Sequence, residues 1–86
     1  MGISYTAHAA AMLVERKIPP EWIQHTIKEP DRTYTGVDGN LHYLKSVPES
    51  GNRVLRVVVN PTAIPVTVVT FSFDRRVKGS HEIKSG

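Results

Sequence analysis

The stretch TAHAAAMLVERKIPPEWIQHTIKEPD, residues 6–31, decides the fold class because it predicts two consecutive helices. Thr6 is a suitable N-cap for a first helix that runs to about Lys17, and apolar side chains recur along it at helical spacing. The Pro19–Pro20 pair ends this helix, since proline lacks a backbone N–H. Proline also suits the first turn of a helix, so a second helix is expected directly afterwards, up to about Lys28.

The hydrophobic period changes from helical to alternating after Asp31, which predicts strands. Four strands are expected, at Arg32–Thr35, Leu41–Val47, Arg53–Val59 and Val66–Phe73. The predicted fold class is therefore α+β, with two N-terminal helices packed on one face of a four-stranded antiparallel sheet (ααββββ) in a single domain over residues 1–73. Residues 74–86 are basic and polar, and we expect them to form a loosely held C-terminal tail.

The alternation of the middle strands also predicts which side chains share a face of the sheet. If the turn between them pairs Val47 with Arg53, then His42 and Arg56 lie on the face away from the helices. A register slip of one residue would bring Tyr43 and Lys45 to that face in place of His42. The side chains expected to join the helices to the other face are Ala9, Leu13, Trp22, Ile23, Ile27, Leu55, Val57 and Val59.

Composition limits the function classes. The 86 residues leave room for one modest core, and the absence of cysteine excludes disulfides and thiolate metal sites. The four histidines lack paired ligand spacing, so no metal and no cofactor are expected. No segment resembles a leader or a membrane span, which predicts a cytoplasmic protein with no membrane partner. The net charge of +3 is compatible with a polyanionic partner such as RNA.

Six residues have the chemistry that RNA cleavage without a metal requires. Histidine suits proton transfer because its charge changes near neutral pH, and the planar fork of arginine suits phosphate. The candidate catalytic residues are His8 and His42, and the candidate substrate-binding residues are Arg16, Lys45, Arg53 and Arg56. Structural roles are the alternative: His8 could pack at the edge between helix and sheet, and Arg16 could pair with a carboxylate such as Asp31.

A set of residues in a fixed order resembles a known family over residues 5–73. The set comprises His8-Ala9, Glu15-Arg16, Ile18, Glu21, Pro30-Asp31, Leu55 to Val59 and Val68-Val69-Thr70, and it resembles the domain of unknown function 4258 family. The chain departs from the family pattern at three positions. Met12 stands where the family usually has arginine, Lys17 where it has glycine, and Pro19 where a capping serine or threonine is usual.

The resemblance implies a fold similar to the RelE/ParE and BrnT group of small bacterial toxins, which includes ribonucleases that need no metal. It implies a toxin-like domain that cleaves RNA and is held silent by an antitoxin-like partner protein. Two other functions are compatible with the sequence: a non-catalytic module that binds a protein or nucleic acid, and a domain that handles another anionic ligand. The sequence does not decide whether the chain is an enzyme, nor its oligomeric state.

Overall fold

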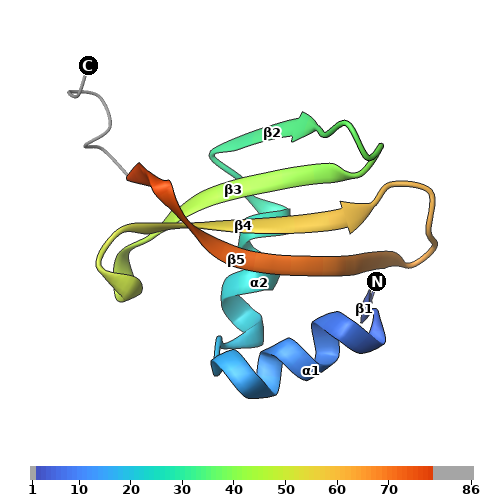
Figure 1. Ribbon diagram of the computed structural model, residues 1–86, viewed down its shortest axis with the longest axis horizontal. Helices are drawn as coiled ribbons and strands as arrows, with labels where there is room; N and C mark the ends of the chain where they lie inside the picture. The colour runs from blue at the N-terminus through green and yellow to red at the C-terminus, as the bar shows by residue number, and fades with distance from the viewer. Residues whose placement is uncertain (1, 79–86) are drawn as a thin grey trace.

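Both predicted helices form, and their capping residues explain where they begin and end. The computed structural model describes residues 2–78 (Figure 1). Helix α1 spans Ala7–Arg16, and the hydroxyl of Thr6 accepts a hydrogen bond from the backbone N–H of Ala9 at 3.1 Å. The helix ends at Lys17, which adopts a left-handed conformation with φ 53°. Helix α2 spans Pro20–Lys28 and begins with proline in its first turn, as the sequence predicts.

Five strands form the sheet, not four. They are β1 (Ile3–Tyr5), β2 (Arg32–Thr35), β3 (Leu41–Val47), β4 (Arg53–Asn60) and β5 (Val66–Lys78), in the spatial order β1-β5-β4-β3-β2. Strands β2 to β5 are antiparallel to their neighbours, whereas β1 precedes the helices and pairs parallel with β5. The expected antiparallel ααββββ arrangement is therefore wrong in its strand count and in the direction of one edge strand. Three residues are too few to show a period, so only the long-range pairing with β5 reveals β1.

The last strand is also longer than expected. Strand β5 continues past Phe73 to Lys78, and a register shift opposite Arg53 and Val54 marks an irregularity in its pairing with β4. Residues 74–78, which were expected to belong to a loose tail, instead extend β5, and Asp74 and Lys78 pair with β4. Residues 79–86, the rest of the expected tail, lie outside the described residues.

The core lies between the two helices and one face of the sheet (Figure 1). Ala9 and Ile23 from the helices and Leu55 and Val57 from β4 are fully buried, which confirms the expected side of the sheet. The core cluster also includes side chains that the sequence analysis had not assigned to it: Met12, Ile18, Val47, Val68 and Phe71. Of the other expected members, Leu13, Trp22 and Ile27 are half-buried and pack around this cluster. Within residues 2–78, no helix is both long and apolar enough to span a membrane.

Candidate functional site

The strand register places two of the predicted site residues together on the face away from the helices. Val47 pairs with Arg53, His42 with Val58 and Leu44 with Arg56, which is the register that the sequence analysis required. On this face, Nη1 of Arg56 lies 3.3 Å from Nδ1 of His42. The prediction that these two side chains converge is confirmed.

Tyr34 and Asp74 complete a group of four side chains, which we call the sheet-face cluster: Tyr34, His42, Arg56 and Asp74. The Arg56 guanidinium donates hydrogen bonds to the Tyr34 hydroxyl through Nη1 and to the Asp74 carboxylate through Nη2. The side chain of Arg56 is 22% exposed and that of Asp74 is 7% exposed, so this ion pair is largely shielded from water. Partial burial acts to lower the pKa of Arg56, but the hydrogen bonds to Asp74 and Tyr34 outweigh it and raise that pKa. The cluster therefore holds a permanent cation.

The contacts of His42 define where its proton lies. A guanidinium group can only donate hydrogen bonds, so Nδ1 of His42 accepts from Arg56 and the neutral ring carries its proton on Nε2. This Nε2 lies 3.7 Å from Oδ1 of Asp38. The backbone N–H of Asn40 bonds Asp38 and is the main reason why the pKa of Asp38 is lowered, with a smaller contribution from His42. An ionised carboxylate thus faces one nitrogen of the ring and a guanidinium faces the other.

The loop between β2 and β3 fits closely around this ring. A Cβ atom built on Gly36 would lie 2.5 Å from Nε2 of His42 and 2.9 Å from Oδ1 of Asp38. Both distances are below any normal contact, so only glycine lets the backbone pass beside the imidazole in this arrangement. Gly36 therefore helps to fix the position of His42.

Two other predicted substrate-binding residues lie on the helix-covered face. Nζ of Lys45 donates to the backbone oxygen of Glu29 at 2.8 Å and lies 3.7 Å from Oδ1 of Asp31. The guanidinium of Arg53 lies 4.1 Å from the ring centre of Phe73, which itself contacts Trp22 of α2. The structure therefore does not bring Lys45 and Arg53 together with Arg56.

The remaining two predicted site residues, His8 and Arg16, are exposed on α1, which packs against the other face of the sheet. The alternative pairing of Arg16 with Asp31 is wrong, because Asp31 instead accepts from the backbone N–H of Ser46 at 2.9 Å and lies beside Lys45. Arg16 forms no ion pair with any described residue. Neither residue contributes to the sheet-face cluster.

Sequence reasoning did not assign Tyr34, Asp38 or Asp74 to the site. Tyr34 pairs directly with His42 across β2 and β3, so the same alternation that placed His42 could have placed it as well. Asp74 had no such signal, because the fourth predicted strand ended one residue before it. No group of three or more potential metal ligands occurs in the described part of the chain.

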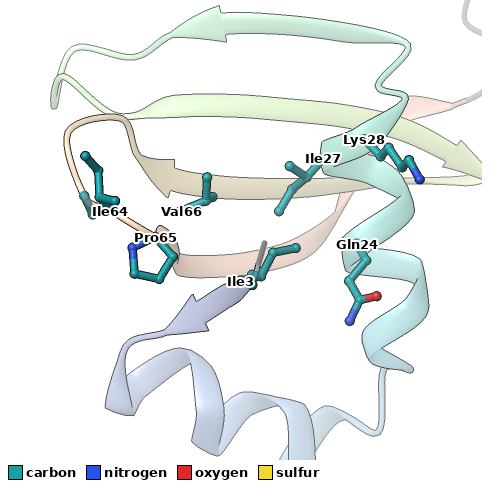
Figure 2. Close-up of a pocket in the computed structure, with 9 residues that line it drawn as sticks. Ile3, Gln24, Ile27, Lys28, Ile64, Pro65 and Val66 are labelled. Carbon is teal, nitrogen blue, oxygen red and sulfur yellow. The ribbon is translucent and has the colours of Figure 1, made fainter.

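A separate hollow of about 910 Å³ opens on the helix side of the molecule (Figure 2). Ile27 of α2, Ile3 of β1 and Val66 of β5 supply apolar surface, and Ile64 in the preceding loop is almost fully exposed beside them. Gln24 and Lys28 lie at the helix side of the hollow. Its lining suits an apolar group and lacks the paired acid and base needed for proton transfer.

Comparison with known families identifies the chain. The family model described as "Domain of unknown function (DUF4258)" matches residues 5–71. The chain belongs to the DUF4258 family. Comparisons with curated proteins and with solved structures gave no significant match. The matched segment includes both helices and His42 and Arg56, but ends before Asp74, so the cluster draws one of its members from outside the matched segment.

The three departures from the DUF4258 pattern have visible structural consequences. Met12 is 7% exposed and belongs to the core, so this position packs in the present chain where an arginine would bring a cation. Lys17 holds the left-handed conformation that glycine adopts at lower cost. Pro19 precedes α2 without any side-chain cap.

Proposed function

We propose that the sheet-face cluster binds RNA and cleaves it without a metal ion. The observation that carries this proposal is the contact between His42 and Arg56 on the face of the sheet away from the helices, with Tyr34 and Asp74 beside them. These side chains supply a proton acceptor, a phosphate-binding cation and a hydroxyl within one small area. The overall net charge of +3 supports the approach of a polyanion.

The proposed chemistry is attack by the ribose 2′-hydroxyl on the adjacent phosphorus. The oxygen–phosphorus bond that forms closes a 2′,3′-cyclic phosphate, and the bond to the 5′-oxygen of the next nucleotide breaks. His42 takes the 2′-hydroxyl proton at Nδ1 once Arg56 turns from the ring to the phosphate, and Asp38 stabilises the resulting imidazolium through Nε2–H. The Tyr34 hydroxyl donates a proton to the leaving oxygen and regains one from water. Asp74 is a positioning residue, because it holds the guanidinium above the sheet.

The proposal is tested with purified protein and labelled single-stranded RNA, in EDTA to exclude metal-dependent contaminants. We expect binding to weaken as salt rises, because phosphate contacts release counterions. His42→Ala should leave binding largely intact and lower the cleavage rate by ~10²-fold or more, the usual scale for general acid–base catalysis. His8→Ala and His25→Ala are matched controls, since both residues are exposed and lie on the helices.

Arg56 is tested by Arg56→Gln together with Asp74→Asn, so that both charges of this partly buried ion pair are removed at once. The double variant should bind RNA more weakly, whereas Arg16→Gln, which removes an exposed arginine on α1, should not. Neither binding nor cleavage by the folded wild-type protein would refute the proposal. Cleavage that survives His42→Ala would refute the role given to this residue.

Biological context adds a further proposal. We infer a fold similar to that of the RelE/ParE and BrnT toxins, and on this analogy we propose that an antitoxin-like protein holds the activity silent in the cytoplasm. A gene for a small DNA-binding protein beside the gene for this chain would support the pairing. Relief of growth inhibition when both are co-expressed would test it directly, and the absence of any growth inhibition by this chain would count against it.

A second candidate function is a non-catalytic module that binds a partner protein, and the apolar hollow favours it. Ile64 is 96% exposed and Val66 is 39% exposed beside this hollow, so apolar surface is available there to a partner. Ile64→Asp should abolish partner binding under this second function and leave RNA binding and cleavage unchanged under the first. Because Ile64 is exposed, the substitution should not unfold the domain.

A further inference from the structure

The stacking of Tyr34 on His42 determines which way the free face of the Tyr34 ring points. The two rings are nearly parallel, with an interplanar angle of 10° and centroids 4.7 Å apart. Adjacent strands of a sheet are separated by about the same distance, ~4.8 Å. Since Tyr34 and His42 are direct cross-strand partners, the stack runs across the sheet from β3 to β2.

This stack ends at an edge of the sheet. Strand β2 is the outermost strand on its side, and in the described part of the chain no strand lies beyond it. The ring face of Tyr34 that does not contact His42 therefore points outward, and Tyr34 is 43% exposed. An aromatic ring with one supported face and one open face is a platform on which a further flat ring can stack.

A cation lies beside the same platform. The guanidinium carbon of Arg56 is 5.7 Å from the centre of the Tyr34 ring, and Arg56 also donates to the Tyr34 hydroxyl. An aromatic base that stacks on Tyr34 would thus have a positive charge within reach of its attached phosphate. A flat ring joined to a phosphate is the chemistry of a nucleotide.

We propose that Tyr34 is a stacking platform that selects an unpaired nucleobase, so that the preferred ligand of the sheet-face cluster is single-stranded RNA and not a duplex. This inference rests on the proposed RNA-binding function and specifies its substrate class. In a duplex each base is stacked between its neighbours and cannot lie against Tyr34 unless it leaves the helix. Selection for single strands follows from the platform without any base-specific hydrogen bond.

The test measures the affinity of wild-type protein and variants for a fluorescein-labelled single-stranded oligoribonucleotide by fluorescence anisotropy. Tyr34→Leu should weaken binding by roughly 5- to 150-fold, which corresponds to the ~1–3 kcal/mol typical of one stacked base. Tyr34→Phe keeps the ring and should retain most of the affinity. Thr33→Leu is the matched control, because Thr33 is the exposed neighbour of Tyr34 on β2.

Three altered ligands identify the contact. Replacing single nucleotides in turn by an abasic residue should find a position where wild-type affinity falls and Tyr34→Leu has no further effect, since both changes remove the same stack. The duplex of the same sequence should bind more weakly and show little dependence on Tyr34. Free 5′-AMP distinguishes an RNA segment from a free nucleotide, and affinity for AMP equal to that for the oligonucleotide would overturn RNA as the ligand.

The outcomes separate this inference from the proposed function. Wild-type protein that binds the oligonucleotide, with Tyr34→Leu binding equally well, overturns the platform and leaves the RNA-binding function standing. Equal affinity of the wild-type protein for single-stranded and duplex RNA likewise overturns the platform and leaves the RNA-binding function standing. A folded wild-type protein that binds neither single-stranded nor duplex RNA overturns both the platform and the RNA-binding function. Circular dichroism and thermal unfolding of each variant show whether a loss of affinity comes from a loss of fold.

Discussion

Replacing Gly36 by alanine should displace the His42 ring without unfolding the domain. The added Cβ would lie 2.5 Å from Nε2 of His42 and 2.9 Å from Oδ1 of Asp38, so one or both side chains must move by about an ångström to reach normal contact. Both contacts are with the ends of side chains that can rotate. The side chains of His42 and Asp38 can therefore move away from the added Cβ while the backbone of the loop stays in place.

The expected change in stability is small. A forced shift of a side chain away from its preferred rotamer costs about 0.5–1.5 kcal/mol. Gly36 does not have a positive φ, unlike Gly39 and Gly51, so alanine at position 36 gains about 0.4–1 kcal/mol from the lower entropy of the unfolded chain. The two effects largely cancel, and we expect a net loss below about 1 kcal/mol. That corresponds to a fall in Tm of no more than ~8 °C for a domain of this size.

The effect on the site should be much larger than the effect on stability. A catalytic group misplaced by about 1 Å can lose ~10²-fold in rate. Two measurements test the reasoning: thermal unfolding, and the NMR resonances of the His42 ring, which report its position even without an activity assay. Gly2→Ala is the matched control, because a Cβ on Gly2 would meet nothing within 4 Å. Unchanged His42 resonances in Gly36→Ala would refute the close contact, and a loss of fold would refute the claim that the strain is local.

Three further predictions concern stability and are measured by thermal or denaturant unfolding. Leu55→Ala should cost about 2–4 kcal/mol, because Leu55 is fully buried between the helices and the sheet, whereas Val14→Ala at an exposed position should change stability by less than about 0.5 kcal/mol. Tyr5→Phe should stabilise the domain by about 1 kcal/mol, since the Tyr5 hydroxyl is buried and has no hydrogen-bond partner among the described residues. Burial raises the pKa of Tyr5 above 10.0, so the Tyr5 hydroxyl ionises first in the unfolded state, and the stability of the wild-type domain should fall as pH rises through about 10. Tyr5→Phe should lack this part of the fall, and identical pH profiles of wild type and variant would contradict the prediction. Lys17→Gly should raise stability by up to about 1 kcal/mol, because glycine adopts the left-handed conformation at this position without steric cost. A loss of stability would show that contacts of the lysine side chain stabilise the domain by more than the left-handed backbone of Lys17 destabilises it.

Local signals in the sequence were sufficient to predict the helices and strands that have a clear hydrophobic period or a clear boundary residue. Both helices have a capping threonine or a leading proline, and the limits of β2 and β3 agree with those predicted. The register of β3 and β4 followed from alternation and from one turn, because a slip by one residue would have exposed the core side chains. The same alternation predicted the convergence of His42 and Arg56.

What the sequence did not show depends on contacts between distant segments. Strand β1 has only three residues and exists through its parallel pairing with β5, more than sixty residues later. Four of the five residues from Asp74 to Lys78 are polar, and the strand continues there with Asp74 and Lys78 paired to β4. Asp74 enters the site through that pairing. A local pattern cannot report these features, because the information lies in the partner strand.

The pairing of Arg56 with Asp74 sets a limit on how the cluster can use its cation. A carboxylate beside the guanidinium weakens its attraction for a ground-state phosphate, so tight binding of substrate through Arg56 alone is not expected. As the 2′-oxygen attacks, negative charge on the phosphate grows, and the guanidinium, which has by then turned from His42 to the phosphate, stabilises this added charge. An arrangement of this kind favours the transition state over the ground state, which is the condition for catalysis. The same argument requires that most of the affinity in the ground state comes from another contact, and the open face of Tyr34 is positioned to supply it. Under this account, Tyr34→Leu raises KM because the stack is lost and lowers kcat because the proton-donating hydroxyl is lost. Arg56→Lys, which keeps the charge and loses the planar fork, changes mainly kcat.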